Sequence, residues 1–149
     1  MSESFIKYDG RKGFWIEEVF MQLLFHYINN ELIKPQYSFI NKDNILFNSQ
    51  FHLDGYSRGI LSLGWTNEIE NNEVNTMISV LQNVKIMLQN KGSFIPVNEL
   101  QAIPTEDEDF KRFYRHPFPT SELIKIVNAL IQMLQGTWTS TNYSMDINY

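Results

Sequence analysis

The sequence predicts a mainly α-helical protein that folds as a single compact multi-helix domain over residues 1–149. Two observations favour this fold class. Residues 14–34 are apolar at 13 of 21 positions, and residues 72–91 place apolar side chains at the spacing of a helix. Two segments fall outside the helical pattern. They are an irregular middle segment, Pro35–Gly64, and a non-helical C-terminal tail at residues 136–149.

The most apolar segment, Phe14–Lys34, is expected to form a core helix that is covered on most of its circumference. Gly13 precedes it, and Pro35 ends it because proline lacks the N–H that a continuing helix needs. The residues before it, 1–12, are expected to be an irregular lead-in. Polar residues recur at helical spacing and predict one thin solvent-exposed strip, which also argues against a membrane span of about 20 mostly apolar residues. The strip comprises Glu17, Glu18, Gln22, His26, Asn29 and Asn30.

The middle segment is rich in apolar residues without a clear period, so much of it is expected to be buried. Asp43 and Ser57 are candidate N-caps for two helices, which would reach about Phe51 and Trp65. Short strands are the open alternative, because the apolar residues alternate only briefly. The interpretation favours helices.

Three more helices are predicted beyond the middle segment. Apolar spacing places one at about residues 72–91 and the last at residues 122–135, and a glycine follows each. Residues 93–104 are predicted to be a loop, after which Thr105 and Glu108 match a capping box that would begin a short helix. Apolar and polar residues alternate in the tail, which predicts either an edge strand or a frayed end.

Composition and charge narrow the class of partner. The chain has no cysteine, and its N-terminus lacks the apolar core of a signal peptide, so a cytoplasmic protein is expected. The net charge of −5 is unevenly spread, because residues 61–110 hold eight acidic and only two basic residues. Phosphate binding needs clustered basic side chains, so the charge distribution argues against nucleic acid and favours a basic partner.

Two short acidic segments, one separate aspartate and one tryptophan supply the candidate binding residues. The acids lie where helices are predicted to begin, and the helix dipole favours negative charge there, so a structural role is the competing interpretation. A tryptophan near an exposed tail is a candidate anchor for a partner, although most tryptophans are core residues. The candidates are Asp54, Glu68, Glu70, Glu73, Glu106, Asp107, Glu108, Asp109 and Trp138.

A search for chemistry finds no catalytic motif. The glycines lack the spacing of a phosphate-binding loop, and neither a zinc-binding HExxH nor a G-x-S-x-G motif is present. No catalytic residue, metal ion or cofactor is therefore predicted. His52 and Asp54 are the one pair that could act in acid–base chemistry or form half of a metal site, although a loop histidine beside a turn aspartate is the commoner explanation. A small hydrolase that uses these two residues is an open alternative.

Four segments of the chain also carry a family resemblance. They are GFWIEEVFMQLL at Gly13–Leu24, LDG and RGILSLGW within Leu53–Trp65, IPVNELQAI at Ile95–Ile103, and FPTSELIKIVNALIQMLQG at Phe118–Gly136. In this order they resemble a family of small bacterial proteins that includes contact-dependent growth inhibition immunity proteins of the CdiI type. The resemblance rests on packing residues and covers most of the chain.

The resemblance implies a mainly helical inhibitor that is not an enzyme and needs no cofactor. It would bind the C-terminal domain of its cognate toxin, a basic nuclease, as a heterodimer and cover the active site. Such toxins are commonly RNases that cleave tRNA, and an EndoU-type ribonuclease is the specific expectation. The implied partner is thus a protein, and nucleic acid, membrane and small-molecule substrate are not expected. The resemblance places no contact residue, and a helical adaptor for another basic protein is the third hypothesis.

Overall fold

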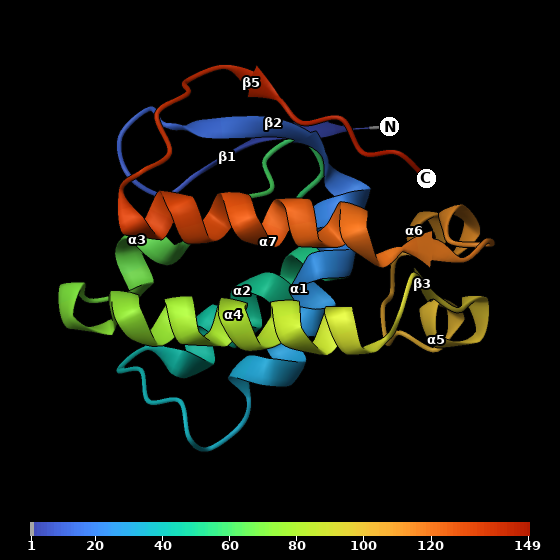
Figure 1. Ribbon diagram of the computed structural model, residues 1–149, viewed down its shortest axis with the longest axis horizontal. Coiled ribbons are helices and arrows are strands. Elements are labelled where there is room, and N and C mark those ends of the chain that lie inside the picture. Colours follow the sequence, from blue (N-terminus) through green and yellow to red (C-terminus); the bar gives the residue numbers. More distant parts are fainter. Residues whose placement is uncertain (1) are drawn as a thin grey trace.

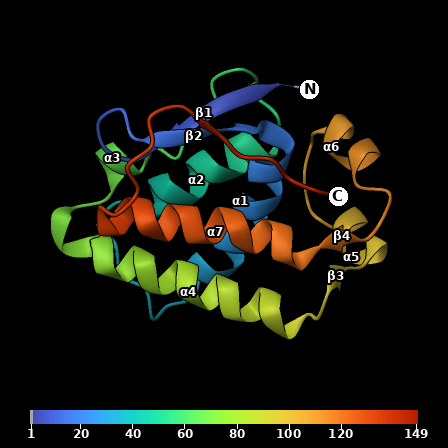
Figure 2. The same cartoon turned by 45° about the horizontal axis from the view of Figure 1, so that its top comes forward.

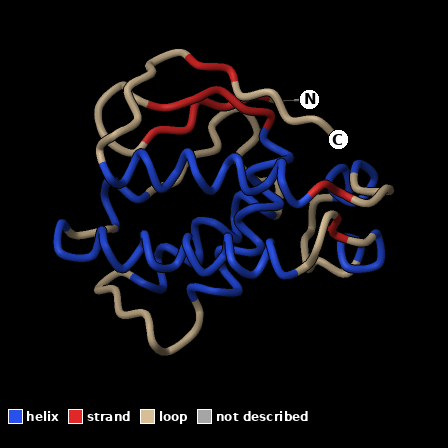
Figure 3. Tube along the Cα trace, viewed as in Figure 1, coloured by secondary structure: helices blue, strands red, loops and turns tan. Residues whose placement is uncertain are grey.

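The computed structural model describes residues 2–149 and shows a mixed α/β protein (Figure 1 and Figure 3). The structure is 53% helical and 11% strand, and within residues 2–149 it has seven helices and two small sheets. The predicted mainly α fold class is therefore wrong. Strands occupy both ends of the chain, where backbone pairing between short segments overrides the weak local signal.

The larger sheet joins the N-terminal segment to the tail. Strands β1 (Glu3–Lys7) and β2 (Gly13–Glu17) pair antiparallel, and β5 (Tyr143–Ser144) pairs with β2 in parallel. This sheet covers one side of the helical body (Figure 1 and Figure 2). The irregular lead-in expected at residues 1–12 is therefore wrong for the described residues, which include β1. Of the two alternatives left open for the tail, the structure shows an edge strand, limited to Tyr143–Ser144.

The first predicted helix begins four residues later than expected. Phe14 and Ile16 are buried whereas Trp15 is 41% exposed, so these residues alternate as strand residues do. Gly13 fixes the close approach of the two strands, because an added Cβ would lie 2.0 Å from the carbonyl oxygen of Ile6. Because this strand carries apolar residues on both faces, its sequence resembles that of a helix that is buried on all sides.

Helix α1 (Glu18–Leu32) lies at the centre of the molecule and confirms the predicted core helix. It packs against α2 (Lys42–Leu53), α4 (Val74–Asn90) and α7 (Thr120–Gln135). Helices α4 and α7 lie side by side (Figure 1 and Figure 2). All three partner helices were predicted within a few residues of their bounds.

The remaining elements are short. They are α3 (Trp65–Glu68), the 3-10 turn η1 (Asn71–Glu73), β3 (Phe94–Ile95), α5 (Val97–Gln101), α6 (Glu108–Phe113) and β4 (Phe118–Pro119), and β3 and β4 pair antiparallel. Residues 93–104 therefore contain a strand and a helix in place of the predicted loop. The helix expected from Ser57 is absent from residues 57–64, which the structure describes as turns and coil.

The polar strip of α1 is not uniformly exposed. Glu18 is 6% and Gln22 is 7% exposed, because both side chains have hydrogen-bonding partners inside the protein. Within residues 2–149, no helix has the length and apolar content that crossing a membrane requires. The buried polar end of α1 leads to a group of polar side chains that line an internal pocket.

Candidate functional site

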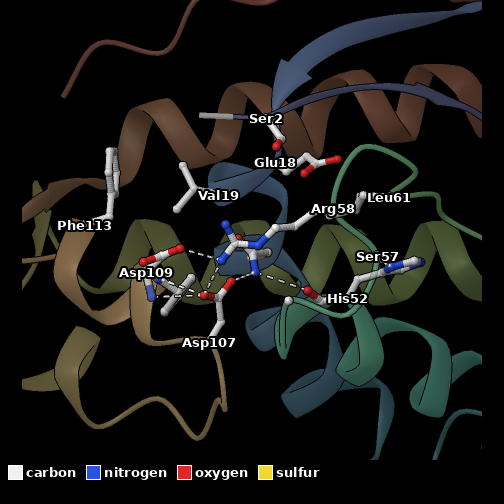
Figure 4. A pocket seen from close by; sticks show the side chains of 13 residues that line it. Ser2, Glu18, Val19, His52, Ser57, Arg58, Leu61, Asp107, Asp109 and Phe113 are labelled. Carbon is white, nitrogen blue, oxygen red and sulfur yellow. Dashed lines mark hydrogen bonds and ion pairs between the residues drawn. The ribbon is translucent and has the colours of Figure 1, made fainter.

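A pocket of about 310 Å³ opens between α1, the loop that follows α2, and α6 (Figure 4). Apolar side chains of Val19, Leu61, Phe110 and Phe113 form part of its wall. The polar residues that line it are Ser2, Glu18, Gln22, His52, Ser57, Arg58, Asp107 and Asp109.

Asp107 connects three elements at this pocket. Its carboxylate accepts from the backbone N–H of Asp109 at 3.0 Å and of Phe110 at 3.4 Å, which caps α6. It also accepts from Nε2 of Gln22 at 2.8 Å and pairs with Arg58 at 3.1 Å, and Arg58 reaches Asp109 at 2.7 Å (Figure 4). Asp107 is only 8% exposed, so it is an internal cap and not a surface acid.

His52 and Ser57 form a hydrogen-bonded pair inside the same pocket. Nε2 of His52 accepts from the backbone N–H of Ser62 at 3.4 Å, which assigns the ring proton to Nδ1 and makes Ser57 the acceptor. Burial lowers the pKa of His52 below its ordinary value, although the charge of Glu18 opposes this shift. In this tautomer a neutral His52 cannot take the proton of Ser57, so the pair braces the loop.

Glu18 also helps to hold the loop of residues 55–61 in place. Its carboxylate accepts from the hydroxyl of Ser4 on β1 and from the backbone N–H of Gly59 at 2.9 Å. The Ser4 hydroxyl in turn accepts from the backbone N–H of Leu61 at 3.1 Å. The polar groups of the pocket thus bond to one another and hold residues 55–61 in place.

Asp54 does not join His52 in the pocket. Its Oδ1 accepts from Nε2 of Gln50 at 3.2 Å and from the backbone N–H of Glu106 at 3.0 Å. Asp54 borders a separate cavity on the outer face of α2. The acid–base pair that the hydrolase alternative requires is therefore not brought together.

The outer cavity has a volume of about 280 Å³ and is lined mainly by aromatic rings. Phe47 is 72%, Phe51 is 39% and Tyr56 is 58% exposed, and the three rings adjoin in one exposed apolar patch. The rings of Phe47 and Phe51 stack with centroids 6.3 Å apart, and the centroid of Tyr56 lies 5.3 Å from that of Phe51. We call this cavity the aromatic groove, and its residues are Phe47, Gln50, Phe51, Asp54 and Tyr56.

The buried Asp107 carboxylate helps to position the aromatic groove, because it packs against the loop that carries Tyr56. Gly55 has a φ of 84°, and a Cβ at this position would lie 2.6 Å from the Asp107 carboxylate, so only glycine fits between Asp54 and Tyr56. Tyr56 then projects outward and donates its hydroxyl proton to Glu106, which is exposed. One short loop therefore faces the interior with Ser57 and the outside with Tyr56.

The structure separates the two predicted acidic segments. Glu68 belongs to α3 and Glu70 precedes η1, whereas Glu106 and Glu108 lie at the start of α6, at the opposite end of the molecule (Figure 1 and Figure 2). No single acidic surface can contain all of them. Of the second group, Glu106 contacts two residues of the aromatic groove, Asp54 and Tyr56.

Three of the acidic candidates have internal or paired roles. Glu73 is 7% exposed and accepts from the backbone N–H of Ile40 at 2.7 Å and of Glu70 at 3.0 Å. Asp109 is exposed but paired with Arg58 and with Arg112 at 2.9 Å. Asp107, the third, also replaces the predicted capping box. Its carboxylate caps α6, while the Thr105 hydroxyl accepts from the Asp107 N–H at 3.0 Å.

Trp138 fastens the tail to the sheet. Its Nε1 donates to the carbonyl oxygen of Gly13 at 2.9 Å, and its ring meets Phe14 edge-on with centroids 5.8 Å apart. The side chain is partly buried, so the structure does not present it as a free anchor.

Sequence reasoning missed the aromatic rings of the groove, because it expected much of the apolar middle segment, which contains Phe47, Phe51 and Tyr56, to be buried. A signal was nevertheless present. Four groove residues lie at positions i, i+3, i+4 and i+7 of α2, which places them on one helical face. The buried residues Ile45, Ser49, His52 and Leu53 occupy the other face.

Comparison with known proteins gave no match to a family description, to a curated protein or to a solved structure. The aromatic groove and its neighbouring acids are therefore the features of the molecule that bear on its function.

Proposed function

We propose that this chain is an immunity protein that binds the C-terminal nuclease domain of a contact-dependent growth inhibition toxin and covers its active site. The observation that carries the proposal is the aromatic groove, with three exposed rings beside the acids Asp54 and Glu106. Exposed aromatic side chains that gather at one place are typical of the residues that dominate binding energy at protein interfaces.

Charge supports a basic partner for this surface. The chain carries a net charge of −5, and Asp54 and Glu106 border the groove, with Glu108 two residues further along the chain. A nuclease holds phosphates in a basic cleft, so an acidic surface would steer the two proteins together and compete with RNA. A tRNA-cleaving RNase of the EndoU type is our specific candidate, bound as a heterodimer in the cytoplasm.

The other hypotheses are less well supported. The hydrolase needs His52 and Asp54 in one place, whereas they line different cavities. An adaptor for another basic protein would use the same groove and differs only in the identity of the partner. The resemblance to CdiI-type proteins favours the toxin as that partner.

Co-expression with a neighbouring toxin gene tests the proposal. The chain would be produced with the toxin domain encoded next to it, purified as a complex, and added to an RNA-cleavage reaction. We expect a one-to-one complex and loss of cleavage at equimolar ratio. A toxin that still cleaves RNA and forms no complex would refute the immunity function. The double variant His52→Gln/Asp54→Asn would then test the hydrolase alternative.

A further inference from the structure

We propose that the aromatic groove binds the guanidinium group of one arginine side chain from the basic partner. This inference rests on the proposed function, because the partner supplies the arginine. It adds the chemical identity of the group that enters the groove. Three properties of the groove carry it: the faces of its rings, its carboxylates and its size.

The ring faces suit a flat cation. Phe47 and Phe51 are nearly parallel, with an angle of 26° between their planes, and Tyr56 continues the row at 39° to Phe51. The face of an aromatic ring carries partial negative charge and attracts cations within about 6 Å. A planar guanidinium stacks on such a face and is weakly hydrated, whereas a lysine ammonium is compact and strongly hydrated.

Two carboxylates, those of Asp54 and Glu106, border the groove beside Tyr56. Within residues 2–149, both hydrogen bonds that the Asp54 side chain accepts end on Oδ1, so Oδ2 is available to a donor from outside. Glu106 is held at the edge of the groove by the Tyr56 hydroxyl and carries a second negative charge. Arginine donates from several N–H groups in one plane, so it can stack on Phe51 and bond to Asp54 at the same time.

The size of the groove restricts its occupant. About 280 Å³ falls just below the range of pockets that hold small molecules and cofactors. One long side chain that enters from a docked protein surface fills such a space. The stem of arginine is apolar and would lie along Phe47, which is the most exposed of the rings.

The test uses the full chain labelled with nitrogen-15 and three small probes, followed by NMR. The probes are the N-acetyl methylamides of arginine, of lysine and of citrulline, which is the neutral isostere of arginine. We expect saturable shifts at residues 47–56 and 106, with arginine binding about tenfold more tightly than citrulline and more tightly than lysine. Equal binding of arginine and citrulline, or shifts outside the groove, would overturn the assignment.

Matched variants identify the contacts. Phe47→Ser and Asp54→Asn should each weaken arginine binding about five- to tenfold, and Asn at 54 retains an acceptor for Gln50. Phe94→Ser is the control, since Phe94 is a 54% exposed phenylalanine outside the groove. An arginine affinity that Phe94→Ser lowers as much as Phe47→Ser would refute the site.

Binding of the toxin domain separates this inference from the proposed function. If the toxin is neutralised and Phe47→Ser and Asp54→Asn leave its affinity unchanged, the immunity function stands and the arginine site is wrong. If arginine binds in the groove and the neighbouring toxin does not bind, the site stands and the proposed function falls. A concentration-dependent dimer that Phe47→Ser dissociates would show that a second copy occupies the groove, which also overturns the inference.

Discussion

Nε2 of Gln22 on α1 donates to the carboxylate of Asp107 at 2.8 Å, which joins residues 85 positions apart. The same nitrogen lies 3.2 Å from the carbonyl oxygens of His52 and Leu53 at the end of α2. One buried amide thus connects α1, α2 and the start of α6. The position of the aromatic groove depends on this connection, because Asp54 and Tyr56 directly follow these carbonyls.

Replacing Asp107 should destabilise the protein strongly. Asp107→Ala removes the cap of α6 and leaves the amide of Gln22 and the charge of Arg58 without their carboxylate. We expect a loss of about 2–4 kcal/mol in the free energy of unfolding, measured with urea. Asp109→Ala is the control and should cost much less, because this side chain is 57% exposed and water screens its ion pairs. Equal losses for the two variants would show that Asp107 is not the cap.

The core can be tested at two positions on different helices. Phe20 is 2% exposed on α1 and Leu81 is fully buried on α4. Phe20→Ala or Leu81→Ala should lower the free energy of unfolding by about 2–5 kcal/mol. Ile40→Ala, at a residue that is 77% exposed, should change it by less than about 0.5 kcal/mol. A core loss as small as that of Ile40 would refute the packing described above.

Stability should fall as the pH drops below about 6.5. The pKa values of His52 and His26 are lowered mainly because burial disfavours the charged ring. The unfolded chain, with ordinary histidine pKa values of 6.5, therefore binds protons first as the pH falls. The free energy of unfolding is therefore unaffected by these histidines above that pH. Below it, each histidine lowers this free energy by at most about 1.4 kcal/mol per pH unit.

Urea unfolding between about pH 8 and pH 5 measures this decline. His52→Gln and His26→Gln should each make the curve flatter, because glutamine does not titrate. An unchanged slope in both variants would show that these histidines titrate normally in the folded protein.

The two acidic ends of the molecule should differ in their effect on association. Glu106→Gln/Glu108→Gln should slow binding of the toxin domain and reduce its dependence on salt. Glu68→Gln/Glu70→Gln removes the same charge at the far end, next to α3, and should have a smaller effect. Stopped-flow rates between about 50 and 500 mM salt, where the Debye length falls from about 14 to about 4 Å, measure the difference. Identical rates for both variants would argue against steering at the groove.

Trp138 should stabilise the C-terminal tail and should not contribute to binding of the partner. Trp138→Ala removes the hydrogen bond to Gly13 and the contacts with Phe14 and Tyr143. We expect faster hydrogen exchange at the amide of Met145, which donates to the carbonyl oxygen of Trp15 at 2.9 Å. Affinity for the toxin domain should not change. A large loss of affinity with an intact tail would restore Trp138 as a contact residue.

The long helices were predictable because their signal is local. Met77, Leu81, Val84 and Leu88 repeat along α4 at helical spacing, and all are buried. The strands were not predictable in this way. Strands β1 and β2 have five residues each and β5 has two. Pairing stabilises these short segments more than their own sequence does, because β1 and β2 form a hairpin and the distant β5 pairs with β2.

The candidate site was predicted only in part, for a related reason. Asp54 and Glu106 were chosen by charge, and the structure places them together beside the groove. Charge alone could not distinguish the buried Asp107 from the exposed acids beside it. Its burial follows from contacts with Gln22 and Arg58, which lie far away in the sequence. The aromatic residues were missed because α2 carries apolar residues on both faces, which hides its orientation.

Helix α2 has one buried face and one exposed face, so the residues that bind a partner can change without disturbing the fold. Ile45, Ser49 and Leu53 on the inner face are buried, so substitutions there disturb the core. Phe47 stands in solvent on the outer face, where most substitutions leave stability within about 0.5 kcal/mol. A lineage of such proteins could therefore acquire a new partner through point mutations in one helical face, and each intermediate would still fold.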